Sequence, residues 1–552
     1  MSGAAGLRPM ILSLMRIVVA CVLAGCGGDG AAPVDAAGGD GGGAWRSALY
    51  PVDWTPAMTA ADGGFVHDFS YAGYRRSEVA LPTAWPGIVV DVMDHGARPG
   101  TGEDSAPAFA AAVAAVAAAG GGVVYVPDGE YVLASRLRID RGGILLRGAS
   151  RTGTRLRFTA AVAGDAASIT FAGAASPAGG AIALIEDGAP RSHVVRVADP
   201  AGLAVGDDVL LDIEITRAFV DELGMAGLWD TGSNSALGAR KVFFRREIVA
   251  IAGGAITLDV PLRYPLRVRD GAAIRRDAGA LRECGVEHLS ITDVTTAAVA
   301  SASPRAHAIE LSHVEDCFVR DVASYASPAA PVAGAHLRSG GVYVVGSKRV
   351  TVADVTMAHA QNHGDGGAGY GLEASGSSEV LFRDSRVEDV RHGLIQNWDF
   401  GSSGLVWLRC DSVGNTLAGD PVIGGRSEFH HRLAMANLFD STRDTVGFVA
   451  HNRGTESSNA GLTATESVFW NVAGAGPGTY LISYQAGRGY VIGTRDITSQ
   501  VVPGPLEQAL GVADHTEPVD LLEGEGRGAD LVPSSLFDDQ LARRLGGQAP
   551  GS

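Results

Sequence analysis

Four segments of the chain share a pattern that ends in aspartate and recurs about every 30 residues. They read GVEHLSITD, HVEDCFVRD, GSKRVTVAD and GSSEVLFRD, and they end at Asp293, Asp321, Asp354 and Asp384. The intervals between these aspartates are 28, 33 and 30 residues, a period typical of solenoids, in which each turn of the chain stacks on the next. The repeat therefore predicts a coil of stacked strands.

Apolar residues at alternate positions of the repeat identify the expected core. The second position before each aspartate holds Ile291, Val319, Val352 and Phe382, and the fourth holds Leu289, Cys317, Val350 and Val380. Side chains alternate between the two faces of a strand, so both columns should point inward. A fifth turn, GLVWLRC, would place Val406 and Leu408 inside. The aspartates at the strand ends are interpreted as structural groups, and Lys348 as a solvated turn residue.

Composition and charge exclude some classes of protein. Glycine occupies 76 of 552 positions, about twice its usual share of ~7 %, and Lys241 and Lys348 are the only lysines. This composition favours a turn-rich β architecture over a helical bundle. The net charge of −17 argues against nucleic acid as a partner, because phosphate binding needs a basic stripe. We expect a monomer.

The N-terminus has the features of an export signal. Arg8 and Arg16 precede the apolar run IVVACVLAGC, which is too short to span a membrane as a helix. Residues 23–26, LAGC, resemble the lipobox of bacterial lipoproteins, which implies a lipid on Cys26 and a membrane anchor, with Gly27 pointing to the outer membrane or cell surface. A flexible tether over residues 27–44 would follow. Three further cysteines, an odd number, are expected to be packed thiols: Cys284, Cys317 and Cys410.

Residues 89–133 predict a helix followed by a buried strand. Asp104 or Ser105 can cap the helix, Pro107 lies in its first turn, Phe109, Val113 and Val116 form one apolar stripe, and Gly120–Gly122 end it before VVYV. This segment closely resembles the N-terminal cap and first turn of the pectate-lyase superfamily, including polygalacturonase-like proteins. The resemblance implies an all-β fold, a right-handed parallel β-helix with an N-terminal capping helix, over roughly residues 85–500.

Other segments depart from the repeat. Residues 45–84 precede the coil as an N-terminal extension, and residues 200–270 are predicted to form an inserted module of antiparallel strands, with Trp229 in one of its loops. The C-terminal tail, residues 501–552, contains SLFDDQLARRL. We expect this segment to form a short helix that covers the last turn of the coil and protects its open edge.

The segment RHGLIQNWDF, residues 391–400, concentrates polar groups in a chain that is otherwise rich in alanine, glycine and valine. Twelve residues before the aspartates that end the four repeats lie the apolar residues Leu281, Ile309, Val342 and Leu372, and Leu394 has the equivalent position in the next turn. Four extra residues, Asn397–Phe400, are predicted to protrude as a loop. Two positions before the inward residues a polar row is expected, with neighbours about 4.8 Å apart: His307, Gly340, Tyr370, His392 and His431.

These residues suggest cleavage of a polysaccharide. β-Elimination from a uronic acid needs a base, and cationic or amide groups that stabilise the charge developing on the carboxylate. The catalytic candidates are His392, Asp399, Glu373, Arg391 and His431. The candidates for substrate binding are Tyr343, Tyr370, Asn397, Trp398, His430 and Arg432, and the rings among them can stack on sugar faces.

Two alternatives stay open from the sequence. Glu373 and Asp399 could instead serve as the carboxylate pair of a glycoside hydrolase. However, the Gly-His-Gly and Arg-Ile-Lys segments of polygalacturonases are missing, and RHG at 391–393 matches the first of them only in part. The coil could also be an adhesin that binds glycan without cleaving it. No metal site is assigned to the adjacent pair His430 and His431. Calcium stays open, because Asp365, Asp399 and Asp420 fall in expected loops.

Overall fold

The computed structural model describes residues 43–160, 163–175, 177–364, 366–415, 424–503 and 517–546. Cys26 with its lipobox, nearly all of the tether, and the calcium candidates Asp365 and Asp420 lie outside the described residues. Among the helices of the described ranges, none has the length and apolar character needed to cross a bilayer.

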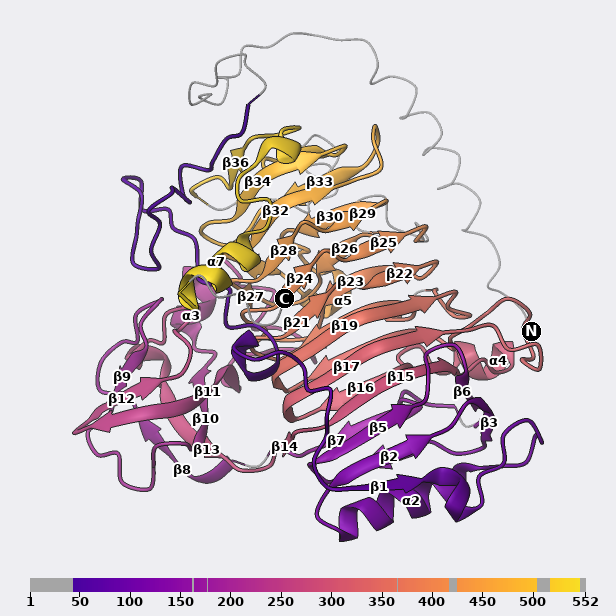
Figure 1. Cartoon of the computed structure of the whole chain (residues 1–552). Helices are drawn as coiled ribbons and strands as arrows, with labels where there is room; N and C mark the ends of the chain where they lie inside the picture. The colour runs from indigo at the N-terminus through magenta and orange to yellow at the C-terminus, as the bar shows by residue number, and fades with distance from the viewer. Residues whose placement is uncertain are drawn as a thin grey trace, which may run out of the picture. The chain divides into compact units, whose positions relative to one another are not determined.

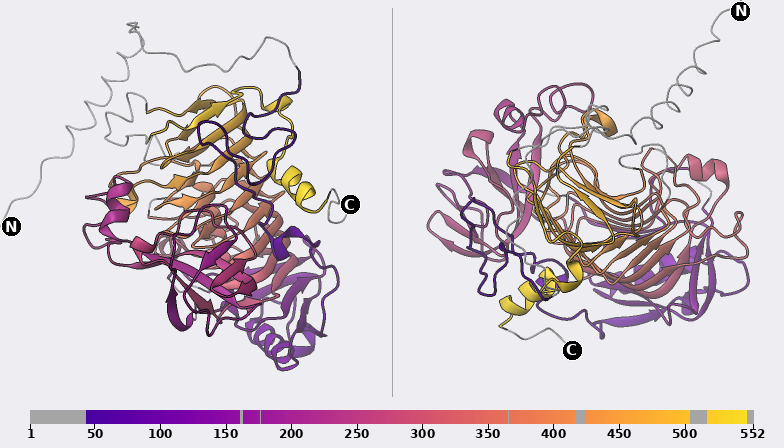
Figure 2. Two further views of the ribbon diagram at one scale, coloured as in Figure 1. Left: turned by 90° about the vertical axis from the view of Figure 1, so that its left-hand side faces the viewer. Right: turned by 90° about the horizontal axis from the view of Figure 1, so that it is seen from above.

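Two long sheets of parallel strands run along the coil (Figure 1). The ten-stranded sheet contains β4 (Leu137–Ile139), β7 (Ile169–Ala172), β16 (His307–Ser312), β18 (Gly340–Val345), β20 (Tyr370–Ser375), β23 (His392–Gln396), β26 (Ser427–Phe429), β30 (Gly447–Ala450), β33 (Tyr480–Ser483) and β35 (Thr498–Gln500). The larger sheet contains β1 (Ile88–Asp91), β2 (Gly122–Val126), β3 (Gly129–Leu133), β5 (Ile144–Gly148), β6 (Thr154–Phe158), β14 (Leu281–Arg282), β15 (Gly285–Thr292), β17 (Val314–Ser324), β19 (Lys348–Ala358), β21 (Leu381–Arg383), β22 (Arg386–Glu388), β24 (Val406–Leu408), β25 (Asp411–Val413), β28 (Leu438–Asp440), β29 (Arg443–Asp444), β32 (Val468–Ala473), β34 (Tyr490–Arg495) and β36 (Leu521–Glu523). A short parallel pair, β27 (Ala434–Met435) and β31 (Ala464–Thr465), lies beside them. The predicted all-β parallel β-helix is confirmed, and the right-hand view of Figure 2 looks along its stacked turns.

The interior of the coil is filled by side chains that stack in register. Val319 pairs with Val352, and Val352 with Phe382, as the repeat predicts. The same column continues through Trp407, whose ring lies 5.6 Å from that of Phe382 and 4.6 Å from that of Phe439. The predicted thiols are also in the core, since Cys284, Cys317 and Cys410 are buried and free.

The fifth turn corrects the sequence prediction by one residue. Trp407 points into the core, whereas Val406 and Leu408 pack on the outside, against the N-terminal extension and the C-terminal helix. A shift of one position reverses every side chain of a strand.

The first turn of the repeat is displaced by five residues. Val286 pairs with Val319, where the repeat predicted Ile291. The residue that stacks beside Asp321 at the corner of the coil is therefore His288 and not Asp293. The other three ladder aspartates do stack there in the left-handed conformation, with φ between 50° and 54°, which aspartate tolerates better than most residues. The inserted module separates β7 from β15, and the spacing within this turn therefore differs from the later ones.

The N-terminal cap forms as predicted. Helix α2 (Ala106–Ala118) packs Phe109 and Val116 against the first strands, beside the short helix η2 (Val92–His95). Ser105 is the N-cap residue but makes no capping bond with its side chain, whereas the Oδ1 atom of Asp104 accepts hydrogen bonds from the amides of Ala106 and Ala134.

The inserted module is larger than the sequence predicted, extending from residue 177 to residue 277. Its sheet contains β8 (Pro177–Ala183), β13 (Ala273–Asp277), β10 (Asp208–Glu214), β11 (Arg240–Ala252), β12 (Ala255–Leu258) and β9 (Val194–Arg196), all paired antiparallel, and the module also holds α3 (Arg217–Glu222) and η3 (Val268–Asp270). Trp229 is fully buried where the module meets the coil, and its Nε1 atom donates to the carbonyl of Ala460.

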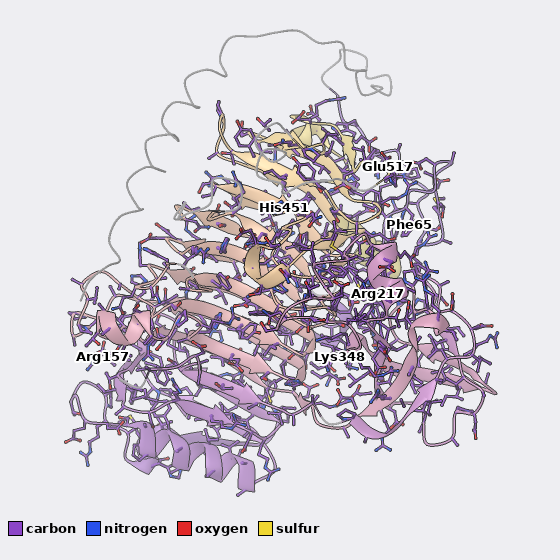
Figure 3. The ribbon with its side chains drawn as sticks, turned by 180° about the vertical axis from the view of Figure 1, so that it is seen from behind. Phe65, Arg157, Arg217, Lys348, His451 and Glu517 are labelled. Carbon is purple, nitrogen blue, oxygen red and sulfur yellow. The ribbon has the colours of Figure 1, made fainter. Side chains whose placement is uncertain are left out.

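Lys348 also belongs to the contact between module and coil, so its interpretation as a solvated turn residue is wrong. The side chain is buried, and its Nζ atom lies 2.6 Å from Asp208 of the module. Figure 3 marks Lys348 at the side of the coil where the module attaches.

The C-terminal helix does not cover the last turn. α7 (Leu536–Arg544) lies across the outside of the larger sheet, where Leu536 and Leu541 pack with the N-terminal extension. Its Gln540 side chain binds the backbone of His67 and Phe69 in that extension. The remaining short helices are η1 (Tyr74–Ser77), α4 (Ala297–Ser301), α5 (Glu456–Asn459) and η4 (Gly528–Asp530).

Candidate functional site

Two cavities on the outer face of the ten-stranded sheet share Arg305 and Trp398, and are here called the paired cavities. Their volumes are about 300 and 360 Å³. The first is lined by Arg305, Gly366, Gly367, Tyr370, Arg391, Asn397, Trp398, His430, His431, Ser457 and Ser458. The second is lined by Arg240, Lys241, Val242, Arg245, Arg305, His313, Tyr343, Val345, Gly346, Ser375, Gly376, Trp398, Asp399 and Phe400. Eight of the eleven predicted site residues line these cavities.

A third cavity, of about 650 Å³, lies on the other sheet beside the corner residues Asp321 and Asp354. Its wall includes His288 and Asp321, which bind each other across 2.7 Å. None of the predicted site residues lines it, so the chemistry expected from the sequence belongs to the paired cavities.

The polar row forms in part. Register places His307 beside Gly340 and Tyr370 beside His392, as predicted. His431 is not in the row. Glu428 pairs with Ile395, and by this register the residue beside His392 would be Gly425. His431 reaches the cavity from the segment that follows β26 instead.

Glu373 is fully buried beneath the cavities at the centre of a polar network. Its Oε1 atom accepts hydrogen bonds from Arg305 at 2.6 Å and from Asn397 at 2.9 Å, and its Oε2 atom lies 2.8 Å from Nε2 of His307. Burial opposes ionisation, but Arg305 and His307 outweigh it and lower the pKa of Glu373 to about 2. The group is therefore a carboxylate that orders its neighbours, and it lines neither cavity.

His392 is also buried and lines neither cavity. Its Nδ1 atom lies 2.8 Å from the carbonyl oxygen of Arg426, to which it donates, and 3.3 Å from Glu428. Burial lowers the pKa of His392 to about 4, so the ring is neutral at pH 7.

His430 and His431 do line a cavity, and each is held from behind. His430 contacts Glu428 through Nδ1, and Arg453 donates to the other oxygen of Glu428 at 2.7 Å. His431 binds the carbonyl oxygen of Ser457 through Nε2 at 2.7 Å, and its ring lies 4.6 Å from that of Trp398. Burial lowers the pKa of both histidines, to about 4 for His431.

The loop Asn397–Phe400 protrudes only in its middle. Trp398 is 44 % exposed, whereas Asn397 is 2 % exposed and Phe400 packs against Trp229 of the module. Asp399 binds Lys241 of the module, and Arg432 lies 3.6 Å from it. The prediction that the whole insertion projects from the coil is therefore wrong, because the module provides a second surface on which the loop packs.

The two remaining predicted residues line different members of the paired cavities. Arg391 lines the smaller cavity and donates to the carbonyl of Gly364 at 3.1 Å. Tyr343 lines the larger of the paired cavities, and its ring stacks on His307 with centroids 4.9 Å apart.

Ligand atoms of His392, Glu428 and His430 lie within 4.8 Å of one another, a spacing compatible with a metal ion. The guanidinium group of Arg453 already neutralises Glu428, and the Nδ1 atoms of both histidines face oxygen partners. A divalent cation would have to displace these contacts. The arrangement therefore fits a hydrogen-bonded network better than a metal centre.

Sequence reasoning did not identify Arg305, Glu428, Arg453 and Ser457. Glu373, Ile395 and Glu428 occupy equivalent outward positions in three successive strands. The sequence repeat would have identified Glu428 if the register of β26 had been known. Arg453 and Ser457 lie in the segment between β30 and β31, which contains the short helix α5, and no repeat signal marks them.

Comparison with known proteins agrees with this architecture. Residues 89–180 match the family model described as rhamnogalacturonase A/epimerase, pectate lyase-like. No curated protein matches the chain.

Similar solved structures include tailspike gp49 of Pseudomonas phage LKA1, with 14 % identity, coverage of 74 % of this chain and 76 % of that chain, and a TM-score of 0.43. The Gp54 tailspike of Acinetobacter baumannii bacteriophage AP22, in complex with capsular saccharide, has 13 % identity over 75 % of this chain and 64 % of that chain, with a TM-score of 0.41. An exopolygalacturonase from Thermotoga maritima has 12 % identity over 76 % of this chain and 94 % of that chain, with a TM-score of 0.32. The N-terminal turns of the coil, residues 89–180, are therefore similar to pectate-lyase-like proteins, and the observed parallel coil is consistent with that similarity.

Proposed function

We propose that the chain binds an acidic polysaccharide in the paired cavities and cleaves it by β-elimination. The observation that carries this proposal is the charge of the cavity walls. Five cationic side chains line them, namely Arg240, Lys241, Arg245, Arg305 and Arg391, against one carboxylate among the described lining residues, Asp399. The chain as a whole has a net charge of −17, so this concentration of positive charge is local to the site.

The carboxylates that pair with two of these cations lie behind the walls. Arg240 pairs with Asp212, and Arg305 with Glu373, and neither acid lines a cavity. Such an arrangement turns the positive ends of ion pairs toward a ligand, which favours an anionic chain such as a polyuronate. Trp398 and Tyr370 add ring faces on which sugars can stack.

Three groups in the smaller cavity supply the chemistry of β-elimination. His431 is assigned as the base that takes the proton at C5, because it lines the cavity and its ring is neutral, and because its Nδ1 atom, which is buried, has no hydrogen-bond partner among the described residues. Arg305 and Arg391 would stabilise the negative charge that develops at the substrate carboxylate. Burial raises the pKa of Tyr370, which keeps its hydroxyl protonated and able to donate to the leaving oxygen.

Glu373 and His392 have a different role in this proposal. Both are buried and line neither cavity, so they are positioning residues. Glu373 orients Arg305 and Asn397, while His392 packs against the rings of Tyr370 and His430.

Hydrolysis is the weaker alternative on this geometry. An inverting or retaining glycosidase needs two carboxyl groups facing the scissile bond. Asp399 is the one carboxylate among the described residues that line the paired cavities. Glycan binding without cleavage would use the same walls and is an outcome of the test below.

We also propose that the protein acts at the cell surface. The lipobox-like segment ending at Cys26 supports a lipid anchor, and the glycine-rich residues after it would tether the coil to the membrane.

The test is to incubate the full chain with polygalacturonate, alginate and neutral dextran and to follow both absorbance near 235 nm and reducing ends. Cleavage by elimination gives unsaturated products that absorb, and we expect them from an acidic glycan but not from dextran. Reducing ends without absorbance would favour hydrolysis. Retention on acidic glycan without any product would favour a binding protein. Equal action on dextran would overturn the assignment of an anionic substrate.

A further inference from the structure

A serine outside the predicted site residues completes a second catalytic arrangement in the smaller cavity. We propose that Ser457, His430 and Glu428 form a nucleophile, base and orienting acid that hydrolyse O-acyl esters carried by the glycan. The proposal rests on the proposed function only for the identity of the acyl carrier, because the triad itself stands on the contacts of these three side chains.

The two nitrogens of His430 face the two other members of the triad. Nδ1 contacts Oε1 of Glu428, and Nε2 lies 3.3 Å from Oγ of Ser457. When Nδ1 keeps its hydrogen and donates it to the carboxylate of Glu428, Nε2 presents a lone pair to the serine hydroxyl, which is the order required for a serine, histidine and acid relay. Burial and the nearby charge of Arg453 hold the pKa of His430 well below its ordinary value, so the ring is neutral and ready to accept a proton.

Arg453 joins the two ends of this relay. One of its nitrogens donates to Oε2 of Glu428 and another donates to Oγ of Ser457, each at 2.7 Å. A guanidinium donor on Oγ stabilises the alkoxide character that develops as the hydroxyl loses its proton. Because Arg453 donates to the oxygen of Ser457, the hydroxyl hydrogen is left to point to Nε2 of His430.

The backbone at Ser457 is held in an unusual conformation. Ser457, Ser458 and Asn459 are successive residues with φ of 48°, 64° and 63°, a left-handed run that costs energy for residues other than glycine. Contacts from both sides maintain it. Nε2 of His431 donates to the carbonyl of Ser457, and Trp229 of the inserted module donates to the carbonyl of Ala460.

The reaction that follows is a balanced acyl transfer. Oγ of Ser457 attacks the ester carbonyl carbon, and its proton passes to Nε2 of His430. The bond from the acyl carbon to the sugar oxygen then breaks, and His430 returns the proton to that oxygen. Water attacks the acyl-serine, His430 takes and returns its proton in the same way, and a free carboxylic acid leaves. Arg391 and Arg305 on the same wall offer N–H donors for the oxyanion.

The substrate is inferred to be a small acyl ester on a sugar hydroxyl. Ser457 and His430 open into the cavity that also contains Tyr370, Trp398 and the cations. At about 300 Å³ this cavity has room for about one sugar residue with its substituent. An ester on a long lipid or in a folded protein would not match these polar and aromatic walls.

The experiment uses the full chain and two probes that need no glycan. A fluorophosphonate should label Ser457, as read by peptide mass spectrometry, and 4-nitrophenyl acetate should be hydrolysed. Acetate release from an acetylated polyuronate then tests the natural class of substrate. Ser457→Ala should abolish labelling and lower ester hydrolysis at least about 10³-fold, as expected for loss of a nucleophile. Glu428→Gln should lower it while preserving the fold, which circular dichroism and melting check.

Ser441→Ala is the matched control, because Ser441 also has a left-handed backbone, with φ of 53°, and lies at a corner of the coil away from the cavity. It should hydrolyse the ester at the wild-type rate. Hydrolysis that survives Ser457→Ala, labelling at another residue, or no hydrolysis of any ester by folded wild-type protein would each overturn the triad. Activity that is lost with a chelator and restored by a metal would overturn it in favour of a metal centre. Unsaturated products at 235 nm are measured separately, so failure of the proposed elimination does not affect this result.

Discussion

The guanidinium group of Arg305 donates a 2.6 Å hydrogen bond to Oε1 of Glu373, although the two residues belong to turns of the coil that are not adjacent. Arg305 precedes β16, and Glu373 lies two strands further on, in β20. The long arginine side chain spans the intervening turn, over the ring of Tyr343. One partly buried ion pair thus ties together the wall of the paired cavities.

Replacing Glu373 by Gln should destabilise the protein. The change leaves Arg305 without its charged partner; removing one member of a fully buried pair costs roughly 3–5 kcal/mol, and the cost here should be smaller because the Arg305 side chain is 18 % exposed. Urea denaturation measures the loss. Glu310→Gln is the control, because Glu310 is in the same outward column and burial raises the pKa of its carboxyl. A Glu373 variant no less stable than the Glu310 variant would contradict the role given to the pair.

Val352→Asp should unfold the coil or lower its stability by several kcal/mol, because it buries a carboxylate in the apolar interior without a partner. Asp354→Asn, two residues along the same strand, changes an exposed corner residue to one that also tolerates the left-handed backbone. The control should stay within about 0.5 kcal/mol of the wild type. A soluble Val352→Asp protein with an unchanged melting temperature would refute the observed register.

Acid should destabilise the protein between pH 7 and about pH 3 in part through His451. Burial lowers the pKa of His451 to about 3, and neither ring nitrogen has a hydrogen-bond partner among the described residues. Below the ordinary histidine value of about 6.5 the unfolded chain binds the proton more readily, so stability falls as pH falls. His451→Leu removes this penalty, which is roughly 2 kcal/mol at pH 5.

The measurement for His451 is the midpoint of urea unfolding at pH 8 and at pH 5, for wild type and variant. The leucine variant should gain more at pH 5 than at pH 8. An identical dependence on pH in the two proteins would show that His451 is paired or accessible in solution.

Asp399→Asn should lower turnover roughly 10-fold, the equivalent of about 1.4 kcal/mol for the loss of one positioning contact, and shift the melting temperature by only a few degrees. Asp399 lines the larger of the paired cavities, and it holds Lys241 at the cavity wall. Asp389→Asn is the control, since Asp389 is also an aspartate with positive φ but lies at a corner away from the cavities. Equal turnover in the two variants would exclude Asp399 from the active site.

Cys26→Ser should release the protein from the membrane fraction or leave its precursor unprocessed, since the lipid would have no thiol to join. Cys21→Ser, inside the apolar run, should be processed normally. Fractionation followed by immunoblotting distinguishes the two, and unchanged membrane partitioning of Cys26→Ser would rule out the lipid anchor.

The sequence by itself determined the coil and much of its core. Strand pairing in a parallel coil brings residues one turn apart into contact, so a repeat of about 30 residues is enough to predict that Val319, Val352 and Phe382 stack. For the same reason it predicted that Tyr370 lies beside His392. These relationships depend only on the alternation of side chains along each strand and on the length of each turn.

The tertiary structure decided which groups meet at the cavities. Insertions of unequal length changed the register at β15 and β26, and a slip of one residue turned Val406 outward and Trp407 inward. The inserted module buried Lys348 and fixed the loop at Asp399, and a loop after β30 brought Ser457 to His430. Contacts of this kind join residues from loops whose paths follow no period, so they depend on packing between segments distant in the sequence, which no local pattern encodes.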